Sequence, residues 1–302
     1  MPQYKVTTAL RLRSSAGVEP NNIKTVLPPD TIVTDAGPSG VTGWLHVTAN
    51  VHNTPLDGYV SWAYVVEVDA AAAADAVSNS ITPVNLSTSQ SITRNQVNGR
   101  AFPLNEQNMP ERGPAALPEA RVAQLWQIMD FLDVEHSARY QPTSSQTFCN
   151  IYAYDYCCRA NAYLPRVWWS GKALTQLSQP NAPSVPIKYG DTVNELTANS
   201  LYDWFHDFGD DFGWQRMLDM DAFQEGVNQG QVGIIVAKRA IVSRSGHIVA
   251  VIPESGAHQA ERSGGRVTGL LQSQAGAKNK KAFTSTWYLS ANFSGFSWWL
   301  HP

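Results

Sequence analysis

An alanine-rich interruption constrains the fold of this chain more than any other feature of its sequence. Residues 69–75 are five alanines between two aspartates, and a stretch rich in Ser, Thr and Asn follows as far as Gly99. Such a composition offers few side chains to a core, so we expect a linker over 69–100. The 302 residues then leave room for one small and one larger domain. The sequence predicts these domains at 1–68 and 101–302.

The segment before the interruption consists of short β-rich runs separated by turn residues. Pro28-Pro29-Asp30 is one such turn, and residues 37–40, which contain two glycines and a proline, form another. Short strands broken by turn residues at close intervals are typical of a small β-barrel. The expected strands lie within residues 7–13, 23–27, 31–34, 43–48 and 58–66.

The segment after the interruption has helical patterns first and strand patterns later. Pro118 precedes an apolar stripe at helical spacing, and a second helical stretch runs from Leu196 to Phe205. Residues 232–236 form a strongly apolar run of strand length. Helices followed by strands favour an α+β domain.

Composition and charge exclude some classes of function. The net charge is −3 and no basic run occurs, so no nucleic-acid partner is expected, because phosphates require clustered Lys and Arg. No apolar run approaches the roughly 20 residues of a membrane span. The opening residues lack the charged and apolar regions of a signal peptide. We therefore expect synthesis in the cytoplasm, with access to any cell wall after lysis, holin-type release or injection.

Three cysteines cannot all be paired, and the adjacent Cys157 and Cys158 are poorly placed for a disulfide. Cys149 follows a polar loop at 141–146 and precedes a run of helical periodicity, which predicts a position at a helix N-terminus. There the helix dipole and unpaired backbone N–H groups stabilise a thiolate, as a nucleophile requires. A cysteine is also often an inert core residue, so this segment alone leaves both interpretations open.

A histidine and two glutamines lie where they could complete such a site. His247 begins an apolar strand, which predicts that its ring lies at the edge of a sheet. The next apolar run ends in Gln272-Ser273-Gln274. An amide oxygen on this neighbouring strand can accept from the second ring nitrogen of the histidine and fix its tautomer. Gln272 and Gln274 share a face if the strand alternates, so both remain candidates.

Three segments of the N-terminal region resemble bacterial SH3-like domains. Residues 10–14 (LRLRS), 43–47 (GWLHV) and 58–65 (GYVSWAYV) follow the order and spacing of the segments that mark these domains. The resemblance implies an SH3-like β-barrel over 1–68. Modules of this kind commonly hold enzymes on peptidoglycan, so it also implies a wall-binding role.

Three segments of the C-terminal region resemble the CHAP and NlpC-type superfamily of papain-like peptidoglycan amidases and endopeptidases. These are residues 147–155 (TFCNIYAYD), 246–253 (GHIVAVIP) and 272–276 (QSQAG). Relatives include phage lysins (endolysins), phage tail proteins and amidase toxins. The resemblance implies a papain-like cysteine peptidase domain without cofactor or metal, in which Cys149 is the nucleophile and His247 the general base. It implies Gln274 as the residue that orients the histidine, although the family usually has Glu, Asn or His there.

The sequence therefore predicts a peptidoglycan hydrolase that cleaves the muramoyl–L-alanine amide or a stem-peptide bond. Two alternatives remain: a papain-like toxin or deamidase that acts on a protein, and an inactive wall-binding or phage structural protein. Peptidoglycan is the expected partner. The resemblance to toxins and phage proteins implies further possible partners: an immunity or inhibitor protein, or a component of a phage or injection device.

A polar cluster offers one further candidate site, a metal centre. It comprises His206, Asp207, Asp210 and Asp211. No HExxH motif or paired-cysteine spacing accompanies these residues, so a solvated loop is the favoured interpretation. Asp155 lies on the expected catalytic helix, where we predict a structural hydrogen bond.

Overall fold

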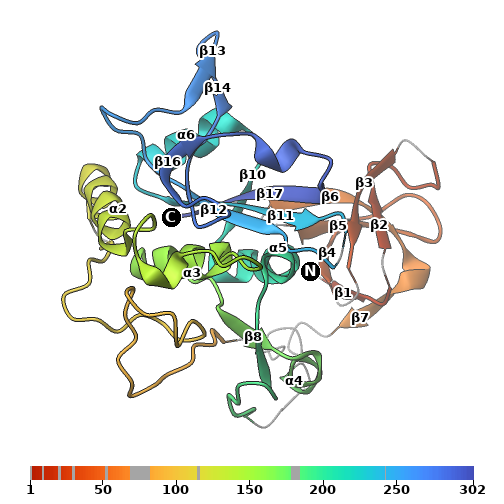
Figure 1. Cartoon of the computed structure of the whole chain (residues 1–302). Coiled ribbons are helices and arrows are strands. Elements are labelled where there is room, and N and C mark those ends of the chain that lie inside the picture. The colour runs from red at the N-terminus through yellow and green to blue at the C-terminus, as the bar shows by residue number, and fades with distance from the viewer. Residues whose placement is uncertain are drawn as a thin grey trace. The chain divides into compact units, whose positions relative to one another are not determined.

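The structure is a computed structural model in which the chain divides into two compact units, Met1–Ser80 and Ile81–Pro302 (Figure 1). Residues 69–81 of the expected linker lie outside the described residues. The described ranges are 2–8, 10–19, 22–28, 31–51, 54–68, 82–113, 116–177, 184–241 and 243–302.

The N-terminal unit contains one antiparallel sheet with the strand order β3-β2-β6-β5-β4-β1-β7. Its core is built by alternation: Leu45, Val47 and Ala49 are buried along β5, with half-buried residues between them. Strands are present within four of the five expected ranges, but the range 58–66 is divided by a 3-10 helix at Trp62–Tyr64, and the strand Gln3–Val6 lies outside the expected ranges. The resemblance to an SH3-like barrel stays a prediction. The elements are β1 (Gln3–Val6), β2 (Leu10–Arg13), β3 (Ile23–Leu27), β4 (Ile32–Gly37), β5 (Trp44–Val51), β6 (Thr54–Ser61), the 3-10 helix η2 (Trp62–Tyr64) and β7 (Val65–Val68).

The C-terminal unit combines helices with an antiparallel sheet of order β10-β17-β11-β12-β15-β16, which confirms the predicted α+β class. Its helices are α2 (Pro118–Leu132), α3 (Cys149–Arg159), α4 (Gly171–Leu177), α5 (Ala198–Phe208) and α6 (Met220–Asn228), with 3-10 helices η3 (Ala138–Tyr140), η4 (Asp210–Phe212) and η5 (Trp287–Leu289). Its strands are β8 (Val167–Trp169), β9 (Val193–Glu195), β10 (Gln215–Met217), β11 (Val232–Arg239), β12 (His247–Val251), β13 (Glu261–Ser263), β14 (Arg266–Gly269), β15 (Leu271–Gln274), β16 (Lys280–Thr284) and β17 (Phe293–His301).

The prediction of a linker over 69–100 is wrong for residues 82–100, which pack onto the C-terminal unit. Val84, Leu86 and Ile92 are buried in its core. The backbone N–H of Val84 donates to the hydroxyl of Tyr163 at 2.8 Å. The segment 82–100 is mostly polar, but its few apolar side chains anchor it, because segments distant in the sequence form the pockets that these side chains enter.

Helix α3 packs against β12, and α5 packs against β11 (Figure 1). Asp155 on α3 accepts hydrogen bonds from Arg139 Nε at 2.6 Å and from the Tyr140 hydroxyl at 2.9 Å, and all three side chains are buried. A buried carboxylate needs such partners to offset its lost hydration. The contacts tie α3 to the 3-10 helix η3, so Asp155 has the expected structural role.

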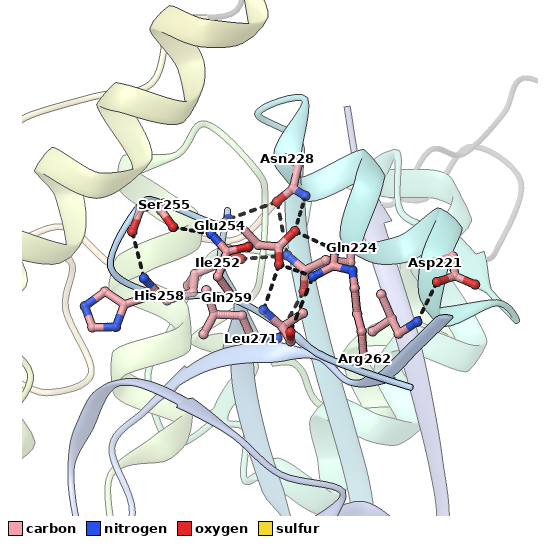
Figure 2. A network of polar contacts seen from close by, with 12 residues as sticks. Asp221, Gln224, Asn228, Ile252, Glu254, Ser255, His258, Gln259, Arg262 and Leu271 are labelled. Atoms are coloured by element: carbon pink, nitrogen blue, oxygen red, sulfur yellow. Dashed lines mark hydrogen bonds and ion pairs between the residues drawn. The ribbon is translucent and has the colours of Figure 1, made fainter. Parts of the chain in front are cut away.

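A polar network on α6 holds together the ends of β12 and β15 (Figure 2). The buried amide of Gln224 donates to the carbonyl of Ile252 and accepts from the backbone N–H of Leu271, each at 3.0 Å. Ile252 follows β12 directly, and Leu271 begins β15. One side chain therefore fixes two strands whose other ends carry His247 and Gln274.

The same network closes the base of the β13–β14 hairpin, which projects from the unit (Figures 1 and 2). Glu254 accepts from Arg262 Nη2 at 2.7 Å, from Asn228 Nδ2 at 2.8 Å and from the backbone N–H of Ala260 at 2.7 Å. These hydrogen bonds lower the pKa of Glu254 to about 2. The carboxylate is therefore charged throughout the physiological range.

Candidate functional site

Cys149 is the first residue of α3, as the sequence predicts, and is 4% exposed. The helix begins where the carbonyl of Phe148 accepts from the N–H groups of Ile151 and Tyr152, both at 3.1 Å. The N–H groups of Cys149 and Asn150 precede these bonds and have no helical carbonyl to bind. That of Asn150 acts on the thiol, where it favours negative charge.

The surroundings of Cys149 favour its thiolate form. Burial raises the pKa of the thiol, but the charge of His247, a hydrogen bond with its ring, and the backbone N–H groups of Ile248 and Asn150 together lower it. The net shift of the Cys149 pKa is downward. These partners stabilise a thiolate, whereas burial alone would raise the pKa of the thiol.

His247 is the first residue of β12, and its ring is held from the side opposite Cys149. Ring atom Nε2 lies 2.7 Å from Oε1 of Gln274, the last residue of β15. The amide of Gln274 also donates to the carbonyl of Lys278 at 3.1 Å, which fixes the amide with its oxygen toward the ring. His247 Nε2 is then the donor, and Nδ1 is the ring nitrogen left for Cys149.

The surroundings of His247 shift its pKa upward. Burial lowers its pKa, but the attraction of Cys149 and the hydrogen bonds with Cys149 and Gln274 raise it, and the net shift of the His247 pKa is upward. Arg239 has a smaller opposing effect. A downward shift at Cys149 and an upward shift at His247 are the directions that a thiolate–imidazolium pair requires.

Gln272 does not reach the histidine. Its buried amide donates to the carbonyls of Leu270 at 3.0 Å and Ser285 at 2.7 Å, and it accepts from Trp287 Nε1 at 2.8 Å. In the pairing with β12, Gln272 lies opposite Val251, whereas Gln274 lies two residues farther along β15 and so nearer to His247. The structure thus brings Gln274 and not Gln272 to the ring.

Trp287 is a site residue that sequence reasoning missed. Its ring meets the ring of His247 edge to face, with centroids 4.7 Å apart and an interplanar angle of 74°. The indole N–H of Trp287 donates a hydrogen bond to Gln272 Oε1. No spacing or motif links Trp287 to His247 in the sequence, so only the fold could reveal the contact.

A groove of about 1030 Å³, here called the Cys149 groove, opens beside the cysteine and the histidine. It is large enough for an extended peptide, since ligand sites of roughly 300–1,000 Å³ hold drug-sized molecules. A smaller hollow of about 470 Å³ shares His247 with it and lies against Trp287. The groove is lined chiefly by residues 142–151 and 243–247 and by Arg100, Arg166, Glu195, Arg239 and Phe293.

Asn199 of α5 holds the turn that leads into His247. Its side chain accepts from the backbone N–H of Arg239 and donates to the carbonyl of Arg244, each at 2.9 Å. A Cβ atom on Gly246 would lie 2.5 Å from the Asn199 Oδ1 atom and 2.5 Å from the carbonyl oxygen of Ala237. Glycine at 246 is therefore required by packing.

The other predicted candidates lie outside this arrangement. Cys157 and Cys158 are free thiols farther along α3, and burial raises the pKa of both. Within the described ranges, no group of three or more His, Cys, Asp or Glu side chains could hold a metal ion, and this includes the cluster around His206. No helix of the described residues is long and apolar enough to cross a membrane.

Comparisons with known proteins give little further information. No protein-family model and no curated protein matches the chain. The solved structure of NlpC2 from Trichomonas vaginalis aligns with 98% of this chain and 96% of its own, with a TM-score of 0.26 and 9% sequence identity. A TM-score this low carries no argument about fold or function.

Proposed function

We propose that this chain is a cysteine-dependent hydrolase that cleaves an amide bond of peptidoglycan. The observation that carries the proposal is the arrangement of Cys149 at a helix start, His247 beside it and Gln274 at 2.7 Å from the far ring nitrogen. This arrangement supports acyl transfer through a thiolate. The substrate class comes from the resemblance of the three C-terminal segments to CHAP and NlpC-type enzymes.

The reaction proceeds through an acyl-enzyme. The Cys149 thiolate attacks the carbonyl carbon of the amide, and backbone N–H groups at the start of α3 stabilise the oxyanion that forms. The imidazolium of His247 gives its proton to the leaving amine as the C–N bond breaks. Neutral His247 then takes a proton from water, which attacks the thioester and releases the carboxylic acid with the thiol restored.

We further propose that the N-terminal unit binds the wall. The support is its run of short antiparallel strands and the resemblance of residues 10–14, 43–47 and 58–65 to bacterial SH3-like domains. A binding unit on the same chain raises the effective concentration of the catalytic unit at an insoluble substrate.

Digestion of purified sacculi tests the proposed function. Wild-type protein and a Cys157→Ala/Cys158→Ala variant should release soluble muropeptides, while Cys149→Ala should release none. Mass spectrometry of the released fragments identifies the new amine and carboxyl groups and thus the bond. Wild-type activity of Cys149→Ala would refute the mechanism, and a folded wild-type protein that releases nothing from sacculi would refute the substrate class.

A further inference from the structure

The Cys149 groove carries a charge opposite to that of the whole chain. Four arginines line it, at positions 100, 166, 239 and 244, whereas Glu195 is the one carboxylate among its lining residues. The whole chain has a net charge of −3. A cleft lined by one sign of charge concentrates and orients ligands of the other sign. The groove is therefore suited to an anionic substrate.

Two of the four arginines are occupied with the protein itself. Arg166 pairs with Glu195 and donates to the carbonyl of Arg100 at 2.9 Å. Arg100 donates to the carbonyl of Arg139 at 2.8 Å, and its guanidinium lies 3.5 Å from the ring centroid of Phe148. These two side chains shape the wall of the groove.

Arg239 is differently placed. It ends β11, is half-buried, and no carboxylate of the described residues pairs with its guanidinium. Its Cζ atom lies 5.1 Å from the ring centroid of Phe293, whose ring meets that of Trp287, and Trp287 meets His247. The guanidinium is thus positioned by the same aromatic wall that flanks the histidine. It is also near enough to act on the charge of His247.

We propose that Arg239 is a specificity residue that binds a free carboxylate of the substrate beside the scissile amide. The planar guanidinium suits a carboxylate because it can donate two parallel hydrogen bonds. This inference rests on the proposed function and narrows its substrate to stem peptides with an unmodified acidic side group near the bond that is cut. In stem peptides where this carboxylate has been converted to an amide, the group has no negative charge for the guanidinium to bind.

Paired soluble muropeptides test the inference, one with free carboxylates and one with the same groups amidated. Wild-type protein should cleave the acidic muropeptide with a kcat/KM on the order of ten- to a hundredfold higher, as expected for a hydrogen bond between charged groups. Arg239→Gln should lose this preference, chiefly through a higher KM for the acidic peptide. Arg239→Lys keeps the positive charge but cannot donate two parallel hydrogen bonds, so this variant should retain part of the preference for the acidic muropeptide.

Arg216→Gln is the matched control, because Arg216 is exposed on β10 and does not line the groove. It removes the same charge and should leave the preference unchanged. Thermal unfolding of each variant shows whether it folds. Equal cleavage of both muropeptides by wild-type protein would overturn the inference and leave the proposed function standing. Cleavage of neither would instead count against the proposed function.

Discussion

The ring of His247 is constrained by three neighbours that come from different parts of the chain. Gln274 binds one ring nitrogen, Cys149 lies at the other, and Trp287 meets the ring edge to face. Each contact removes a rotation or tautomer that would take the ring away from the thiol. In the proposed mechanism, such preorganisation holds the ring where it can transfer a proton to the leaving amine.

The reactivity of Cys149 toward iodoacetamide should depend on His247. In a Cys157→Ala/Cys158→Ala background, where Cys149 is the remaining one of three cysteines, the lowered Cys149 pKa predicts alkylation at a pH below the ordinary thiol range. Adding His247→Ala removes the charge that lowers this pKa, so the profile should move to higher pH. The measurement is the rate of adduct formation by intact mass as a function of pH. Identical profiles for both proteins would contradict an ion pair.

Substitution of the two glutamines should separate catalysis from stability. Gln274→Ala frees the histidine ring and should lower kcat on the order of ten- to a hundredfold, by loose analogy with groups that orient metal-bound histidines. Gln272→Ala leaves buried hydrogen-bonding groups unpaired and should lower the free energy of unfolding by about 1–3 kcal/mol. Steady-state kinetics and chemical denaturation measure the two effects. If Gln274→Ala left kcat unchanged and Gln272→Ala lowered it strongly, Gln272 and not Gln274 would be the residue that orients the ring.

At the scale of helices and strands, the site depends on the start of α3, the start of β12 and the end of β15. The sequence predicts the helix that Cys149 begins and the strand that His247 begins, because local periodicity and polar flanks mark both positions. It does not separate Gln272 from Gln274, since the one that lies nearer His247 is set by the register of β15 against β12. It also misses Trp287 and the arginines of the groove, which reach the site only through long-range packing.

The network around Glu254 should make stability depend on pH in the acid range. The folded-state pKa of Glu254 is lowered from 4.5 to about 2, so its contribution is present above the unfolded-state pKa and is lost as pH falls toward 2. Glu254→Gln should lower the free energy of unfolding by about 2 kcal/mol near neutral pH. The difference in free energy of unfolding between wild type and Glu254→Gln should become smaller below about pH 4.5. Urea denaturation at several pH values measures this difference. A gap that does not change with pH would mean that the charge of Glu254 contributes nothing.

At the scale of the whole molecule, the division into an all-β unit and an α+β unit follows from composition and from the change of periodicity along the chain. The boundary does not, because residues 82–100 look like a linker and yet bury Val84, Leu86 and Ile92. Polar composition describes how little a segment can bury by itself. It does not describe the pockets that another segment offers.

Removal of residues 1–68 should separate wall binding from catalysis. The shortened protein should bind sacculi more weakly, because the proposed binding unit is gone, and should cleave soluble muropeptides at the rate of the full chain. Co-sedimentation with sacculi and a soluble muropeptide assay measure the two properties, with circular dichroism as a check on folding. Equal loss of both in a folded protein would show that the N-terminal unit contributes to the active site.

The most direct test of cysteine-dependent hydrolysis is the mass of the acyl-enzyme trapped on the protein. Full-length protein is mixed with a soluble muropeptide, quenched in acid within the first turnover, and digested for tandem mass spectrometry. We expect one acyl group on Cys149, absent from Cys149→Ala, whose mass identifies the bond: a muramoyl acyl group for an amidase, a peptidyl group for an endopeptidase. Hydrolysis that proceeds with no adduct on Cys149, or with the adduct on Cys157 or Cys158, would contradict the account.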